Sequence, residues 1–437
     1  MIILRTVKNI SSLNIAASVL LFLAAILAAV VANSSLSPVY QDFLLQELHL
    51  RIGNFNLFSH GGHPLKMIEF INDCLMTVFF LAVGLEIKRE LLVGELSSVR
   101  KAALPFIAAC GGMVVPVVIY ALSVASGTPE TRGMAIPMAT DIAFSLGVLS
   151  LLGKRVPLSL KIFLTAFAVV DDIGGILVIA LFYSADVAYG YLIAAAVLYV
   201  FLYYMGKFGV TQKIFFLFFG VIIWYLFLQS GIHSTISGVI LAFVIPARPR
   251  LDAGKYIERI RDIIGEFPVS KSDNIVLINA QIATLKQVER ASDYVISPLQ
   301  SLEDNLHGAV SLVILPLFAF ANAGVVFSGS GSIVGDVSIA VAAGLLLGKF
   351  LGIYLFTWLA VKSGVALMPA GMNWKNIAGV SLLGGIGFTV SLFIANLSFA
   401  DEYPELLNQA KFGVLVGTVL AGVLGYVVLN WVLPKRD

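Results

Sequence analysis

Two adjacent carboxylates, Asp171 and Asp172, lie inside an otherwise apolar segment that runs from residue 158 to residue 182. A segment of this length can span a bilayer, where an ionised aspartate near the centre costs roughly 2.5 to 3.5 kcal/mol on insertion scales. Two such groups side by side therefore require a compensating environment. Ionisable residues within a membrane segment indicate an ion or proton site by default. The pair therefore suggests that this segment contributes to such a site.

Two further ionisable residues lie in other apolar segments. Asp141 is within residues 134–153, and Lys349 is within residues 337–361. Four such groups left charged in lipid without partners would cost about 12 kcal/mol, which is comparable to the whole stability of a domain. We therefore expect them to meet one another, or water, inside a helical bundle.

The composition is that of a polytopic membrane protein. Apolar residues make up 59% of the chain and charged residues 12%, against roughly 45 to 50% and 25% in soluble domains. Windows of about 20 residues predict an all-α fold with about twelve transmembrane helices. The division between the seventh and eighth is the weakest, because both are short and another cut would alter the count. The predicted spans are residues 12–33, 67–85, 103–125, 134–153, 158–182, 189–205, 214–229, 231–246, 308–327, 337–361, 377–398 and 409–431.

The basic residues indicate the orientation, since Lys and Arg near span ends stay on the cytoplasmic side. With both termini inside and twelve crossings, 23 of the 28 Lys and Arg residues are cytoplasmic. Four lie outside, and Lys349 is in mid-span. The net charge of +2 is therefore a topology signal and does not indicate a nucleic-acid partner.

The external segment 34–66 contains a pattern typical of β-strands. Apolar residues alternate on either side of Gly53 and Asn54, which predicts a short hairpin at about residues 49–58. An isolated hairpin is marginal in water. We expect it to pack on the protein's own surface or on a second copy.

A charged cytoplasmic connection, residues 247–307, separates an N-terminal membrane half, residues 1–246, from a C-terminal half, residues 308–437. Apolar residues within the connection recur at helical spacing, which favours one or two amphipathic helices. A solvated linker is the alternative.

Asp141, Asp172 and Lys349 are predicted to lie at a similar depth, near the middle of the membrane. At about 1.5 Å per residue, Asp172 lies about 21 Å from the inner face and Asp141 about 10 Å from the outer one, so both approach the middle of a roughly 30 Å core. Lys349 reaches the same layer. Convergence at the midplane is typical of transport sites.

Two spans contain residues that interrupt a helix. Pro137 removes a backbone donor and clashes with the preceding turn, so the fourth span should kink or unwind near Thr140 and Asp141. Three glycines within residues 384–387 weaken the eleventh span, although close helix packing also explains them. Interrupted spans, whose freed carbonyls and helix ends can face ions, indicate a transporter site.

Asp171 and Asp172 cannot share one role, because adjacent residues on a helix point about 100° apart. One carboxylate can face a water-filled cavity while the other turns toward a neighbour such as Lys349. Desolvation favours the neutral form of both members of such a pair, so the pair could exchange a proton near neutral pH. A static ion pair that only fixes packing is the alternative.

Several other polar residues are candidates for a functional role, and each also has a purely structural explanation. His233, near the external start of the eighth span, either forms a structural hydrogen bond or responds to pH. Glu86, at the inner end of the second span, belongs either to a solvated charged face or to a pH-responsive funnel. Asp73 lies again within apolar sequence, where Asn72 accompanies it.

These residues together resemble the NhaA family of sodium/proton antiporters. The likeness covers nearly the whole chain in order, and the combination of ATDIAF at 139–144 with DDIG at 171–174 is specific. The motifs that carry it are FIND at 70–73, VGLEIKREL at 83–91, the run from PMATDIAF to AVVDDIG at 137–174, ILPLFAFANAGV at 314–325, LLGKFLGI at 346–353 and GGIGFTVSLFIA at 384–395.

The resemblance implies a fold and a set of roles. Spans three to five and ten to twelve would be inverted repeats, with unwound fourth and eleventh spans that cross at the midplane. Asp172 would be the principal sodium ligand and proton carrier, with Asp171 as its partner. Lys349 would pair with Asp171, and Thr140 and Asp141 would line the crossing.

The resemblance also implies regulation, assembly and location. Glu86, Arg89 and Glu303 would belong to a cytoplasmic pH-responsive region, whereas the residues around His233 do not establish its role. The hairpin would join two protomers in the bacterial inner membrane. The connection at 247–307 is longer than in other members and departs from the family pattern, which puts pH sensing by this region in doubt.

We therefore predict a secondary antiporter, not an enzyme, that exports Na⁺ or Li⁺ in exchange for inward-moving H⁺, is electrogenic and pH-regulated, and needs no cofactor. The carboxylates would bind either a hard cation or protons. A sodium-coupled symporter of a small organic anion is the alternative and would need a polar cavity beyond the carboxylates. An intramembrane aspartyl protease also uses two aspartates, but its GxGD motif is missing, and adjacent carboxylates cannot oppose each other across a scissile bond.

Overall fold

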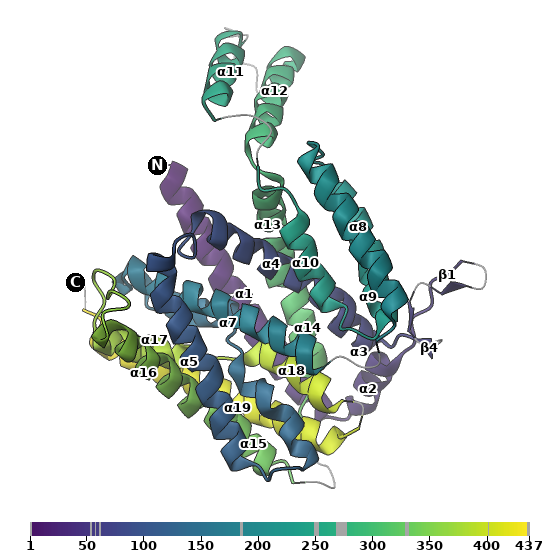
Figure 1. Ribbon diagram of the computed structural model, residues 1–437, viewed down its shortest axis with the longest axis vertical. Helices are drawn as coiled ribbons and strands as arrows, with labels where there is room; N and C mark the ends of the chain where they lie inside the picture. The colour runs from purple at the N-terminus through teal and green to yellow at the C-terminus, as the bar shows by residue number, and fades with distance from the viewer. Residues whose placement is uncertain are drawn as a thin grey trace.

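The computed structural model is a bundle of apolar helices (Figure 1). It describes residues 2–52, 55–56, 58–60, 63–183, 187–248, 253–267, 278–327, 332–400 and 402–434. Helices dominate because lipid offers no hydrogen bonds, so each backbone polar group must be satisfied within its own segment. The chain is an all-α, multi-pass membrane protein.

Eight helical segments in the described part of the chain are long and apolar enough to cross a membrane. Three of them combine three shorter elements each and cover residues 67–93, 298–322 and 336–362. The other five are α5 (Val99–Ser123), α7 (Leu158–Phe182), α8 (Tyr189–Lys207), α9 (Lys213–Ser230) and α19 (Pro404–Val432).

Three bent pairs raise the number of spans to as many as eleven. Helix α1 (Ile2–Ala32) meets α2 (Ser37–Leu45) at 112°, η2 (Pro129–Met138) meets α6 (Ile142–Leu151) at 45°, and α17 (Trp374–Leu383) meets α18 (Phe388–Phe399) at 44°. With the shorter apolar helix α10 (Thr235–Val244), a helical segment lies in each of the twelve predicted spans.

The seventh and eighth spans are separated at residues 230 and 231, at the predicted position. Helix α9 ends at Ser230, and Gly231 follows with a φ of 80°. Left-handed backbone of this kind is easy only for glycine and commonly ends a helix. Helix α2 was not predicted, and its sharp bend shows that it does not continue the first span.

Three spans contain a π-helical turn that the sequence did not predict. These turns are η1 (Ile71–Leu75), η4 (Val310–Ile314) and η5 (Gly344–Gly348). They separate α3 (Met67–Phe70) from α4 (Met76–Val93), α13 (Pro298–Ala309) from α14 (Leu315–Asn322), and α15 (Asp336–Ala343) from α16 (Lys349–Lys362). Such turns frequently accompany functional sites, and η5 directly precedes Lys349.

Glycines allow the closest helix contacts, as is usual in membrane bundles. A Cβ at Gly111 of α5 would lie 2.3 Å from the carbonyl oxygen of Gly352 in α16, and one at Gly352 would lie 2.1 Å from that of Gly111. The two backbones are therefore in direct contact. This contact fixes the helix that carries Lys349 against the third span.

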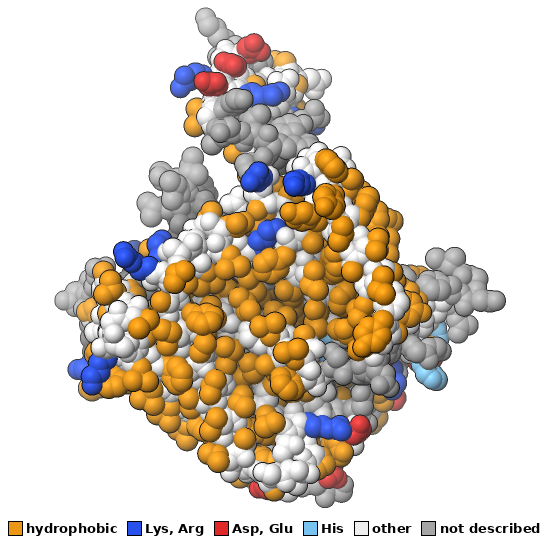
Figure 2. All heavy atoms as spheres, in the orientation of Figure 1, with side chains coloured by type: hydrophobic (Ala, Val, Ile, Leu, Met, Phe, Trp, Pro, Cys, Tyr) orange, Lys and Arg blue, Asp and Glu red, His pale blue; other side chains and the backbone are white. Residues whose placement is uncertain are grey.

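The outer surface is apolar over a broad face, with charged side chains mainly at its margins (Figure 2). Large side chains are well exposed there, as Ile193 of α8 (65%) and Ile214 of α9 (82%) illustrate. In water such a surface would be a liability. It fits the hydrocarbon of a bilayer.

Two excursions leave the bundle. On one side, β1 (Arg51–Ile52) pairs antiparallel with β2 (Phe55–Asn56), and β3 (Ser59–His60) pairs with β4 (His63–Pro64). At one end, α11 (Ala253–Gly265) and α12 (Asn279–Val295) project beyond the other helices (Figure 1). The described part of the connection, residues 247–307, therefore contains α11, α12 and most of α13 (Pro298–Ala309), in place of the solvated linker that was the alternative. The ninth span begins at Pro298, ten residues before the predicted start at residue 308.

Candidate ion-binding site

The interruptions of the fourth and eleventh spans lie against each other. The Asp141 amide donates to the Ile386 carbonyl oxygen at 2.6 Å, and the Thr140 hydroxyl donates to the Gly384 carbonyl oxygen at 2.8 Å. Pro137 and the glycines at 384–387 explain why the helices stop here, because they remove donors and weaken helical backbone. The freed backbone groups of each break thus find partners in the other.

Asp141 connects the helices that begin at the two breaks. Its Oδ1 accepts from the Phe144 amide at 2.9 Å and caps α6, while its Oδ2 accepts from the Thr389 hydroxyl (2.7 Å) and amide (3.2 Å). A carboxylate suits this place because helix N-termini are positive. Thr389 was not among the site residues predicted from the sequence, although its position directly after the glycine-rich break was an available signal.

Lys349 turns toward Asp171. Its Nζ donates to the Thr140 hydroxyl at 3.0 Å and forms an ion pair with Asp171 Oδ2, with both side chains fully buried. The fifth and tenth spans and the break in the fourth thus meet at one polar cluster. The other oxygen of Asp171, Oδ1, has no hydrogen-bond partner among the described residues.

Asp172, the next residue, lines a cavity instead. Its Oδ1 is buried and has no hydrogen-bond partner among the described residues. The cavity has a volume of about 620 Å³. Polar side chains from five spans line it: Glu86, Arg89, Thr140, Asp141, Asp172, Glu303, Asp304, His307, Ser311 and Thr389.

Two ion pairs centre on Arg89, which lines the same cavity. Arg89 Nε donates to Glu303 Oε1 at 2.9 Å, and Arg89 Nη1 lies 2.9 Å from Glu90 Oε1. Glu86 lines the cavity beside them. His307 was not among the residues predicted from the sequence, although it follows Glu303 by one helical turn and so shares its face.

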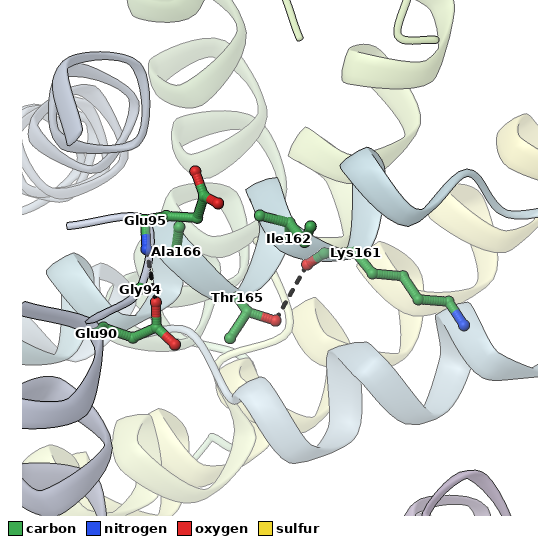
Figure 3. A pocket seen from close by; sticks show the side chains of 7 residues that line it. All are labelled: Glu90, Gly94, Glu95, Lys161, Ile162, Thr165 and Ala166. Atoms are coloured by element: carbon green, nitrogen blue, oxygen red, sulfur yellow. Dashed lines mark hydrogen bonds between the residues drawn. The ribbon is translucent and has the colours of Figure 1, made fainter. Parts of the chain in front are cut away.

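A smaller cavity, of about 270 Å³, lies between the end of α4 and α7 (Figure 3). Glu90 Oε2 accepts from the Glu95 amide at 3.0 Å there. A Cβ at Gly94 would lie 1.9 Å from Glu90 Oε2, so the carboxylate can cap this helix end only beside a glycine. Glu90 is therefore held both by the chain turn and by Arg89.

The remaining predicted residues do not line the larger cavity. Asn72 and Asp73 lie in η1, where Asn72 Oδ1 accepts from Asn322 at 2.8 Å. Ser234 Oγ lies 3.5 Å from Asp73 Oδ1, and His233 immediately precedes Ser234 at the start of α10.

The side chains of this site are of the kind that contact a hard cation. Within the described ranges, no three His, Cys, Asp or Glu side chains are grouped so that they could hold a metal ion. A hard cation prefers oxygen ligands and accepts water among them. Asp172, whose Oδ1 has no hydrogen-bond partner among the described residues, lines the cavity together with Thr140 and Asp141.

A multi-pass helical protein with carboxylates buried at two interrupted spans belongs to the class of secondary transporters in its architecture. The chain matches the family described as Na⁺/H⁺ antiporter 1 over residues 8–429. It is 75% identical to the Na⁺/H⁺ antiporter NhaA of Bacteroides fragilis over 436 residues, which cover 100% of both chains. Identity to the protein of the same name from Bacteroides thetaiotaomicron is 74%, with 100% of this chain and 99% of the relative covered. Identity to that from Porphyromonas gingivalis is 47%, with 99% and 97% covered. The chain belongs to this antiporter family.

Proposed function

We propose that the protein exports Na⁺ or Li⁺ in exchange for inward-moving protons, and that cation and protons compete for Asp172. The single observation that carries this proposal is the Asp172 carboxylate, which lines the cavity with one buried oxygen that no described group satisfies. A carboxylate in that state can be neutralised by a proton or balanced by a cation. Competition between the two couples their fluxes without a cofactor.

Lys349 and Asp171 provide a second place for a proton. The two form a buried ion pair. When a cation binds, Asp171 would turn from Lys349 to the cation, and Lys349 would release its proton. Two protons would then be exchanged for one cation, so each cycle would move net charge and respond to the membrane potential.

The remaining features have roles within the same proposal. Glu86, Arg89 and Glu303, with His307, would form the pH-responsive entrance on the cytoplasmic side, and His233 would act separately at the opposite end. Spans three to five and ten to twelve would be inverted repeats whose interrupted members cross at the site. Hairpins of two protomers would join a homodimer in the bacterial inner membrane, with both termini cytoplasmic.

The larger cavity has the polar lining that an organic-anion symporter would need, but the charges of that lining do not suit an anion. Among the described residues, Arg89 is the one Lys or Arg that lines the larger cavity, and two carboxylates already engage it. An anionic substrate would need a free positive group there.

The test uses proteoliposomes loaded with a pH-sensitive dye and exposed to NaCl, LiCl, KCl or choline chloride. Na⁺ and Li⁺ should drive proton movement, whereas K⁺ and choline should not. Asp172→Asn should abolish the signal in a folded protein, because an amide keeps the shape but carries neither the proton nor the charge. Undiminished Na⁺-driven proton movement in this variant would refute the assignment.

A matched control is Asn376→Ala. Asn376 is a buried polar residue of the eleventh span that does not line the cavity. Exchange should persist in this variant, which separates loss of the site from general disturbance of the span.

A further inference from the structure

Three asparagines from three different spans form a continuous chain of side-chain hydrogen bonds. Asn396 Nδ2 donates to Asn322 Oδ1 at 2.9 Å, and Asn322 Nδ2 donates to Asn72 Oδ1 at 2.8 Å. Asn322 is fully buried, and Asn396 is 8% exposed. The chain therefore ties η1 of the second span, α14 of the ninth and α18 of the eleventh together by specific contacts, of which the Asn396–Asn322 bond is buried and the Asn322–Asn72 bond is partly buried.

The asparagines lie beyond the lining of the larger cavity on their own spans. On each of the three spans, the cavity-lining residue nearest the asparagine is about two helical turns, or about 10 Å, away along the helix. These residues are Phe79, Leu315 and Val390 with its neighbour Thr389. The other lining residues on the second and ninth spans are farther still. None of the three asparagines lines the cavity.

An aromatic layer from the same three spans accompanies the asparagines. The Phe393 ring centroid lies 5.7 Å from that of Phe80 and 6.4 Å from that of Phe318. All three rings are buried, with exposures of 0 to 3%. The apolar layer excludes water but does not fix a register, because apolar contacts are not directional. The hydrogen bonds between the asparagine amides are directional, so they fix the register of the three helices.

We propose that Asn72, Asn322 and Asn396 form a latch that closes the transport pathway at the end opposite the cavity, and that the Asn322–Asn396 bond breaks in every cycle. The inference rests on the proposed function. Asn396 is on the span that also carries Thr389, the partner of Asp141, so the broken bond frees the site-bearing span from the second and ninth spans.

The chemistry of the amide suits a bond that must open. A neutral hydrogen bond contributes little net free energy when water can replace either partner. Wetting of this end would therefore satisfy the separated amides, and both states remain accessible. An ion pair here would cost more to separate in a low-dielectric interior.

The test measures access to the closed end without reference to ion movement. Ile179 is 1% exposed and lies about two turns beyond Asp172 on α7, beside Phe80 and Thr235. In a protein with Cys74 and Cys110 replaced by serine, Ile179→Cys is labelled with a membrane-impermeant maleimide from the face opposite the cavity. Asn396→Ala should raise the labelling rate about five- to tenfold, the factor expected for one lost buried hydrogen bond.

The control is again Asn376→Ala, a buried asparagine in the other half of the same span. It should leave the labelling rate unchanged. No increase with Asn396→Ala, or an equal increase with both variants, would overturn the latch. Because labelling needs no ion movement, this result is independent of the dye assay that tests antiport.

A second variant tests the proposal even if Asn396→Ala does not fold. Asn322→Cys with Asn396→Cys, joined by a short bifunctional thiol reagent, should block transport, and cleavage of the linker should restore it. Full transport by the cross-linked protein would show that this contact need not open, and the proposal would be wrong.

Discussion

Lys349 and Asp171 form an ion pair whose two side chains are both wholly buried, although they come from spans far apart in the sequence. Removal of one partner leaves a buried group without its counter-charge, which typically costs more than removal of both. This asymmetry permits a test of what the pair contributes.

Asp171→Asn or Lys349→Gln alone should lower the free energy of unfolding by roughly 3 to 5 kcal/mol, and the double variant should recover most of the loss. Thermal unfolding in detergent measures the effect. The exposed pair of Arg132 and Glu402 is the control. Arg132→Gln should cost less than about 1 kcal/mol. Additive losses in the buried double variant would contradict the coupling.

The same double variant, Asp171→Asn with Lys349→Gln, should retain weak exchange that responds less to an imposed membrane potential. The reason is that the proposed second proton has lost its carrier. Proteoliposomes with a potassium diffusion potential provide the measurement. Full activity with unchanged voltage dependence would show the pair to be structural.

Apparent Na⁺ affinity should weaken as the pH falls. Protonation removes the negative charge of the carboxylates, so protons displace the cation and the apparent KM rises. Dye-coupled exchange at about pH 8.5 and at about pH 7 compares the apparent KM in a weakly alkaline and a neutral solution. An unchanged KM would indicate separate sites for cation and proton.

Gly352→Ala should destabilise the protein by about 1 to 3 kcal/mol, because the added methyl would overlap the Gly111 backbone. Gly175→Ala is a suitable control, since a Cβ there meets nothing within 4 Å. Unfolding midpoints in detergent distinguish the two. Equal midpoints would show that the contacts between the third and tenth spans can yield without cost.

Deletion of the hairpin at about residues 49–58 should convert a dimer to a monomer, because its strands pair with only one neighbour and leave an edge open. Light scattering on the detergent-solubilised protein reports the mass. A dimer that survives the deletion would place the interface elsewhere.

The sequence by itself determined the helical membrane architecture and the places where its helices stop. Hydropathy and helix-breaking residues act locally: Pro137 lies at the end of η2, and the glycines at 384–387 lie between α17 and α18. The depth of an acid within a span is likewise a count along one helix. For these reasons the amino-acid sequence alone is enough to select Asp141, Asp172 and Lys349.

Only the tertiary structure decided how these groups divide their contacts. Helical geometry required Asp171 and Asp172 to diverge, but the rotation of α7 against its neighbours determined that Asp171 pairs with Lys349 while Asp172 faces the cavity. The π-helical turn at η1 and the chain from Asn72 through Asn322 to Asn396 left no local signal. A hydrogen bond between residues 250 positions apart depends on how whole helices pack, and the residues next to each partner do not encode that packing.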